Sequence, residues 1–190
     1  MMRSLEELSK LVADSNLEDL RVAFASPDHL PCIHITGSCS NDRTAPCPRT
    51  VEYLADQAAK DGQLEVWCYL FDSCLNASSR EISWHSMRHV VRGGDVEFAE
   101  AFELRQPGWA NSIEPMSAPN KTRSMTLIKL AVMRGQLDFL DYLTDKCHCD
   151  VNAGGNERSS VCMVVRMDID DGQYRCIRKG FDAIPLIHCR

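Results

Sequence analysis

Apolar residues near the amino terminus recur at the spacing of an amphipathic helix, so residues 4–24 are predicted to be helical. Ser4 is of a residue type that caps helices, and Glu7 stands three positions later as its capping-box partner. One apolar stripe is formed by Leu5, Leu8, Leu11 and Val12. The polar run 14–16 is expected to end this helix, and a shorter one then begins, with apolar positions at Leu17, Leu20, Val22 and Phe24.

Three glycines further along the chain, Gly62, Gly94 and Gly135, are each followed by the same pattern of apolar and acidic residues. An apolar residue two positions after each glycine precedes an acid, in the pairs Leu64-Glu65, Val96-Glu97 and Leu137-Asp138. More apolar residues follow at steps of three, namely Trp67 and Leu70, Ala99 and Phe102, and Leu140 and Leu143. Such steps put side chains on one helical face. We therefore expect a continuous apolar seam, with Leu64, Val96 and Leu137 at equivalent places along it.

The residues before each of these glycines also have a helical pattern, which is weakest before Gly94. A glycine that ends a helix adopts the left-handed conformation at little steric cost, and a second helix can then return antiparallel to the first. The glycines lie 32 and 41 residues apart, which fits a period of roughly 33 with one enlarged loop. That loop is 106–123, where three prolines and Gly108 argue against a helix.

The segment 126–152 resembles a repeat of the ankyrin family. It opens with Thr126-Leu127-Ile128-Lys129-Leu130-Ala131, where the family has Thr-Pro-Leu-His-x-Ala. The family's Gly-His-x-Glu and aliphatic run correspond to Gly135-Gln136-Leu137-Asp138 and the segment 139–143, and its closing Asp-Val-Asn corresponds to Asp150-Val151-Asn152. The two upstream copies match mainly around Gly62 and Gly94. In all, the resemblance covers roughly 100 residues of the chain, as three repeats of this family would.

Three departures from the ankyrin pattern bear on how the repeats would join. Leu127 replaces the proline that presets the first helical turn, and Lys129 replaces the histidine whose hydrogen bonds tie neighbouring loops. Cys147-His148-Cys149 replaces a Gly-Ala pair with one extra residue. We expect looser hydrogen bonding between repeats and unchanged apolar stacking. The alternative is an unrelated helical protein in which three glycine-ended helices coincide.

The resemblance implies an all-α fold in three parts. An ankyrin-like stack of helix-turn-helix repeats would span 50–153, and the helices and loop of 1–49 would cap it. The tail 154–190 is expected to be irregular or a β-hairpin, because Asp171-Gly172 stands between apolar residues of 161–178. Residues 184–189 look like the opening of another repeat that is cut short.

The composition and charge of the chain argue against several classes of protein. The chain has 190 residues and a formal net charge of −6, and its Lys and Arg are scattered without a basic block, which argues against nucleic acid as a partner. No run approaches the roughly 18 apolar residues of a membrane helix. The amino terminus carries acids where a secretory signal is apolar. We therefore expect a monomeric cytoplasmic or nuclear protein, not a secreted or membrane protein, that keeps its ten cysteines as thiols.

Two clusters of cysteine and histidine were candidates for zinc, namely Cys32, His34, Cys39 and Cys47, and the segment 147–149. Neither has the paired spacing of structural zinc sites. His85 and His89 would share a helical face, but Ser86 stands where a metalloprotease helix has glutamate. The acids of 168–171 lack the spacing of a calcium loop. No nucleophile elbow or phosphate-binding loop is present. We predict no catalytic residue, metal or cofactor.

These observations favour a non-enzymatic intracellular protein–protein interaction module, an ankyrin-like scaffold or adaptor. The resemblance implies that loop tips and first helices line the binding face. Trp109 would either anchor a partner there or fold back over the neighbouring repeat. The alternatives are a zinc-binding or catalytic regulator built on the Cys/His clusters, and a truncated, degenerate relative without function. The residues predicted to bind a partner protein are Lys60, Asp61, Arg92, Trp109, Thr122, Arg123, Met133 and Arg134.

Overall fold

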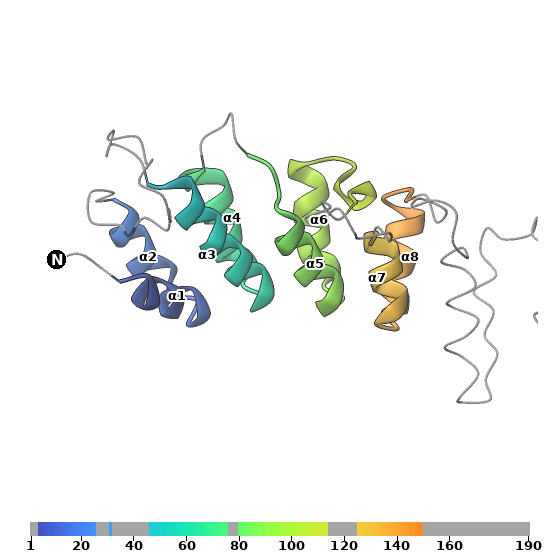
Figure 1. The fold of residues 1–190 in the computed structure, drawn as a ribbon, viewed down its shortest axis with the longest axis horizontal. Helices are drawn as coiled ribbons and strands as arrows, with labels where there is room; N and C mark the ends of the chain where they lie inside the picture. Colours follow the sequence, from blue (N-terminus) through green and yellow to red (C-terminus); the bar gives the residue numbers. More distant parts are fainter. Residues whose placement is uncertain (1–3, 26–30, 32–45, 76–79, 114–124, 150–190) are drawn as a thin grey trace, which may run out of the picture.

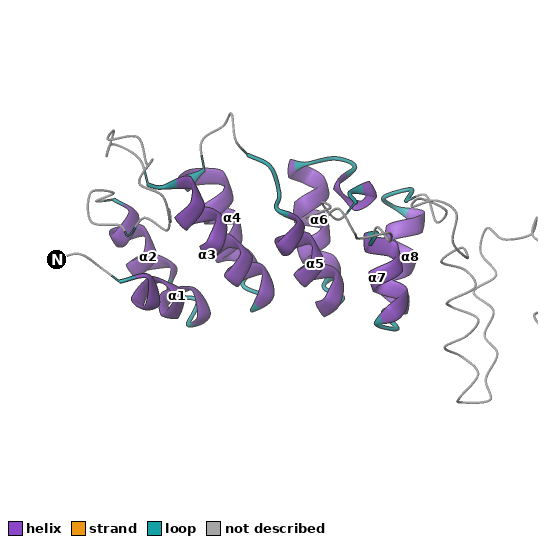
Figure 2. Cartoon of the chain, viewed as in Figure 1, coloured by secondary structure: helices purple, strands orange, loops and turns teal. Residues whose placement is uncertain are grey.

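The structure is a computed structural model that describes residues 4–25, 31, 46–75, 80–113 and 125–149. Within these ranges the fold is all-α, as predicted, and the only β-type pairing is an isolated antiparallel bridge between Ile113 and Thr126 (Figures 1 and 2). The α-helices come in pairs: α1 (Leu5–Ala13) and α2 (Leu17–Phe24), α3 (Pro48–Lys60) and α4 (Leu64–Tyr69), α5 (Trp84–Gly93) and α6 (Val96–Arg105), and α7 (Leu127–Met133) and α8 (Leu137–Asp145).

The four pairs stand side by side along the long axis of the molecule (Figure 1). The first helix of each pair lies in the layer nearer the viewer, and the second helix lies behind it. Within the near layer, α1 packs against α3, α3 against α5, and α5 against α7. Ala55, Ala58 and Ala59 are buried on α3, and their small side chains let neighbouring helices come close. The result is a continuous row of first helices.

Five of the eight described α-helices begin at a residue whose side chain accepts a hydrogen bond from a free backbone amide. The predicted capping box of α1 is confirmed, because the Glu7 amide donates to Ser4 Oγ at 3.1 Å and the Ser4 amide donates to Glu7 Oε2 at 2.7 Å. The second helix begins at Leu17, as predicted. Side chains also cap α5 and α7, from Ser83 and Thr126.

The turns inside the pairs share one backbone conformation. Gly62, Gly94 and Gly135 have φ angles of 70°, 71° and 65°, which confirms the predicted left-handed glycines. Ser15 takes the same place between α1 and α2, with φ of 53°. After three of these turns the next amide donates to a carbonyl five residues back, in the pairs Asn16 to Leu11 (2.9 Å), Gln63 to Ala58 (2.8 Å) and Gln136 to Ala131 (3.1 Å).

The predicted apolar seam needs a correction at its first position. Leu64, Val96 and Leu137 do occupy equivalent places, since each is the first residue of its helix. Leu64 and Val96 are only half-buried, however, and the side chain of Leu137 is 54% exposed. Leu64 and Val96 pack against the edge of the core beside the turns, and Leu137 does not. The seam begins one turn later, at the buried residues Trp67 and Leu70, Ala99 and Phe102, and Leu140 and Leu143.

Other predicted boundaries shift by a few residues. The helix α3 begins at Pro48, two residues before the predicted start of the stack, because proline fits the first helical turn. The segment 106–123 contains the short 3-10 helix η4 (Trp109–Asn111), so the prediction of no helix there is wrong for one turn. Val22, one of the apolar positions of the second helix, is exposed. The predictions for 154–190, and for most of the loop before α3, lie outside the described residues.

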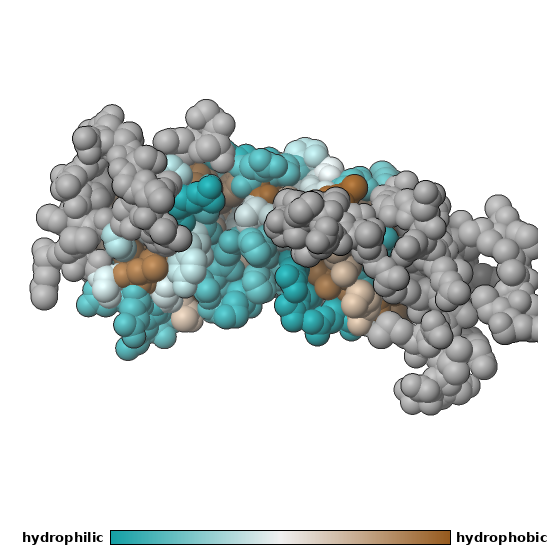
Figure 3. Space-filling model, in the orientation of Figure 1, coloured by the Kyte–Doolittle hydropathy of each residue, from teal (hydrophilic) through white to brown (hydrophobic). Residues whose placement is uncertain are grey.

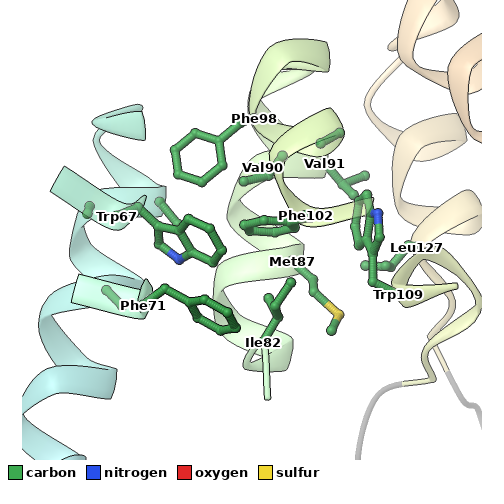
Figure 4. Close-up of a cluster of buried hydrophobic side chains, with 14 of the residues drawn as sticks. Trp67, Phe71, Ile82, Met87, Val90, Val91, Phe98, Phe102, Trp109 and Leu127 are labelled. Carbon is green, nitrogen blue, oxygen red and sulfur yellow. The ribbon is translucent and has the colours of Figure 1, made fainter. Parts of the chain in front are cut away.

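A cluster of aromatic rings joins the second and third pairs (Figure 4). The π-helical turn η2 (Leu70–Cys74) extends α4 and brings Phe71 against Trp67, with ring centroids 4.8 Å apart. Trp67 also lies 5.6 Å from Phe98 and 4.6 Å from Phe102, across the gap to α6. Beside this cluster, Arg105 binds both carboxylate oxygens of Asp72, at 2.9 and 2.7 Å. Apolar and ionic contacts therefore hold the second layer together at this junction.

Candidate functional site

The exposed sides of α3, α5 and α7 form one surface, which we call the first-helix face. On α5 the helical period separates the two sides: Met87, Val90 and Val91 are buried, whereas Arg88 and Arg92 are exposed. The corresponding accessible side chains are Arg49, Tyr53 and Lys60 on α3, His85 on α5, and Lys129 and Met133 on α7. Figure 3 looks onto this side, where hydrophilic residues dominate over α3 and α5 and apolar ones surface near α7.

Five of the residues predicted to bind a partner lie at the carboxyl ends of these three helices. Lys60 and Asp61 end α3, Arg92 lies in the last turn of α5, and Met133 and Arg134 end α7. All five are exposed, and Met133 has 46% of its surface accessible. The fold thus lines them up along the edge formed by the turns (Figure 1). Partner binding by these residues stays a prediction, and Thr122 and Arg123 lie outside the described residues.

Trp109 cannot serve as an exposed anchor, which corrects its place among the predicted binding residues. Its side chain is 1% exposed, and its ring meets Phe102 edge-on with centroids 5.2 Å apart. The 3-10 helix that carries it packs against both α6 and α7. The large indole therefore fills the space between the third and fourth pairs. Within the part of the chain that the structure describes, its Nε1 has no hydrogen-bond partner.

Sequence reasoning missed residues that lie one helical turn before those it selected. Arg88 stands four positions before Arg92, and Lys129 four before Met133, so each pair shares a helical face. His85 lies on the same side of α5. The signal was present, because helical periodicity extends an exposed face along the whole helix and not only to its end.

Polar contacts between neighbouring pairs hold the first-helix face in position. Asp56 of α3 accepts hydrogen bonds from the hydroxyls of Ser83 and Ser86, at the start of α5, the latter at 2.7 Å. Gln136 Nε2 donates to the Arg92 carbonyl at 3.3 Å and so ties the turn after α7 to the end of α5. Ser15 and Gln63 make a matching contact between the first two pairs. The surface is therefore fixed before any ligand arrives.

Four charged residues of α3 and α5 act on His89 in the first-helix face. Burial lowers the pKa of His89, and the neighbouring cations Arg92, Lys60 and Arg88 lower it further, against the opposing effect of Asp56. These cations come from two different helices, so the fold brings them together. Asp56 already serves as acceptor for two serines. Among these charges, Asp56 has the largest single effect on His89, and it raises the pKa.

The Cys/His cluster at 147–149, the second of the two zinc candidates in the sequence, is poorly suited to binding a metal or to nucleophilic chemistry. Cys147 and Cys149 are buried, while His148 is exposed. Burial raises the pKa of Cys149 to about 12 and also raises that of Cys147, so both stay thiols, and the thiolate is the reactive and metal-binding form. In the described ranges no three His, Cys, Asp or Glu residues come close enough to hold a metal ion. Of the first cluster, only Cys47 is described.

No helix within the described ranges has the length and apolar character to cross a membrane. No family model matches the chain, and no curated protein matches it either.

Proposed function

We propose that the chain is a non-enzymatic module that binds a partner protein, and that its helix pairs form an ankyrin-like stack. The first-helix face would be the binding surface. Rigid display would be the mechanism, because a surface that is already ordered loses little entropy on binding.

The proposal is supported above all by the recurrence of one turn between the helices of each pair. Gly62, Gly94 and Gly135 all have a left-handed backbone. After each of them the chain returns in a second helix whose first residue is followed by an acid. The turn at Ser15, followed by Leu17 and Glu18, extends this pattern to the first pair. A unit of this size cannot bury its apolar side alone and is stabilised by its neighbours. A row of such units leaves its first helices free to meet a partner.

Affinity capture with matched variants tests the binding function. We would compare partners captured by the wild-type chain with those captured by a Lys60→Glu/Arg92→Glu variant, which reverses two charges on the first-helix face. The control, Lys10→Glu/Lys146→Glu, makes the same change in net charge on exposed residues of α1 and of the end of α8. We expect a specific set of proteins to be lost only with the face variant. Thermal melts of all three chains would check that each stays folded.

Identical capture profiles for the three chains would refute the first-helix face as the binding surface. Metal analysis of the purified full-length chain addresses the zinc-binding alternative. Stoichiometric zinc, lost together with helical structure on chelation, would favour that alternative over a metal-free binding module.

A further inference from the structure

In the third and fourth helix pairs, the charged residues divide between the two layers. The first helices α5 and α7 contain no Asp or Glu, and their cations are Arg88, Arg92 and Lys129. The second helices α6 and α8 contain one cation, Arg105, which is paired with Asp72. Their acids are Glu97, Glu100, Glu103, Asp138, Asp141 and Asp145. A chain with a net charge of −6 thus exposes a cationic surface on α5 and α7.

The cations of α5 and α7 are available for an external ligand. Among the described residues, the ion pairs are Arg21 with Glu18, Arg49 with Glu52, and Arg105 with Asp72. Arg88, Arg92 and Lys129 belong to none of these pairs. Asp56, the acid that acts on His89, already accepts two hydrogen bonds from serines. An anionic group that binds this surface would therefore pair with cations that form no ion pair among the described residues.

An apolar residue accompanies these cations. Met133 lies one helical turn after Lys129 on α7, with 46% of its surface exposed, and Figure 3 shows apolar surface near α7 beside the hydrophilic surface of α5. Methionine is flexible and polarizable, so it adapts to apolar side chains of different shapes. The combined chemistry of the surface is a small cationic cluster with one adaptable apolar contact.

We propose that the α5–α7 part of the first-helix face binds an acidic segment of a partner protein that also carries an apolar side chain. Arg88, Arg92 and Lys129 would bind the carboxylates, and Met133 would contact the apolar residue. This inference rests on the proposed binding function and specifies the chemistry of its partner.

A protein segment fits this surface better than a nucleic acid. Single-stranded nucleic acids are held by a basic groove together with aromatic side chains on which bases stack. On α5 and α7, the described large apolar side chain that is substantially exposed is Met133, which offers no stacking surface. The acidic second layer would also repel a long polyanion. A short acidic peptide can meet the cations of α5 and α7 without approaching that layer.

Selection from a library of short random peptides displayed on phage tests this proposal with the full chain. We expect the selected peptides to be enriched in Asp and Glu and to include an apolar residue. Their affinity should fall by about tenfold or more in an Arg88→Glu/Lys129→Glu variant and with rising salt. The charge-matched control Lys10→Glu/Lys146→Glu should bind within about twofold of the wild type, because exposed charges distant from the site act weakly.

Two further readouts separate the possible outcomes. Binding of an acidic peptide should raise the pKa of His89, followed by NMR of its ring protons, because carboxylates oppose the effect of Arg88 and Arg92. Selected peptides without acidic enrichment, no selected peptide, or affinity unchanged in the face variant would each overturn the proposal. So would tighter, face-dependent binding of a single-stranded oligonucleotide, or self-association of the chain that the face variant abolishes. If partner capture still depends on Lys60 and Arg92 while acidic peptides fail to bind, only the acidic-segment proposal fails.

Discussion

Two adjacent glycines at the end of α5 show how backbone conformation and nearby atoms decide whether a position tolerates a side chain. Gly94 has a φ of 71°, and the side-chain amide of Gln136 occupies the space that a Cβ there would need. Gly93 is the last residue of the helix, and a Cβ there would meet nothing within 4 Å. A side chain is therefore disfavoured at Gly94 and acceptable at Gly93.

Alanine at these two positions should change stability in opposite directions. We expect Gly93→Ala to raise the free energy of unfolding by about 0.5–1 kcal/mol, because glycine within a helix loses more entropy than alanine on folding. Gly94→Ala should lower it by roughly 1–2 kcal/mol for the left-handed backbone. A further loss of about 1 kcal/mol is expected if Gln136 gives up its hydrogen bond to the Arg92 carbonyl. Urea denaturation measures both, and a shift of the same sign in the two variants would contradict this account.

The residue scale also marks a limit of sequence reasoning. The three glycines could be recognised as left-handed turns because glycine adopts that conformation readily. Ser15 adopts it too, with φ of 53°, but serine is rarely left-handed and gave no such signal. The first pair was therefore predicted as a cap, although its turn matches those of the other pairs.

At the scale of helices, periodicity fixes which side of each helix is buried but not how far the neighbouring layer covers it. The steps of three correctly found Trp67 and Phe102, which are buried. They failed at Leu137, which is exposed, and could not decide whether Trp109 is exposed or fills the space between two pairs. Both depend on contacts between segments that are distant in the sequence.

The aromatic junction between the second and third pairs makes α6 sensitive to one substitution. Phe102 is fully buried and contacts the rings of Trp67, Phe98 and Trp109. Phe102→Ala should lower the free energy of unfolding by about 3–5 kcal/mol, since it removes apolar contacts and leaves a cavity. On the same helix Leu104 is 80% exposed, and Leu104→Ala should change stability by less than about 0.5 kcal/mol. Chemical denaturation followed by tryptophan fluorescence measures both, and similar losses in the two variants would argue against the ring cluster as the main contact.

At the scale of the whole molecule, layering turns scattered residues into a surface. Arg88 and Lys129 are 41 positions apart in a sequence with no basic block, yet they lie on neighbouring helices of one layer. Sequence reasoning identified the ends of α3, α5 and α7, because the turns were visible in the pattern. The separation of cations and acids in the third and fourth pairs emerges only once each helix is assigned to its layer.

In a row of helix pairs, a substitution that destabilises one pair should weaken the adjacent pair more than the distant ones. Leu143 is fully buried in α8, and Leu143→Ala should destabilise the last pair by about 2–5 kcal/mol. Because contacts run mainly between adjacent pairs, native-state hydrogen exchange should accelerate most in α7 and α8, less in α5 and α6, and least in α1 and α2. Equal acceleration in all eight α-helices of the described residues would instead indicate a single cooperative core, and would contradict the proposal that the helix pairs form a stack of neighbouring units.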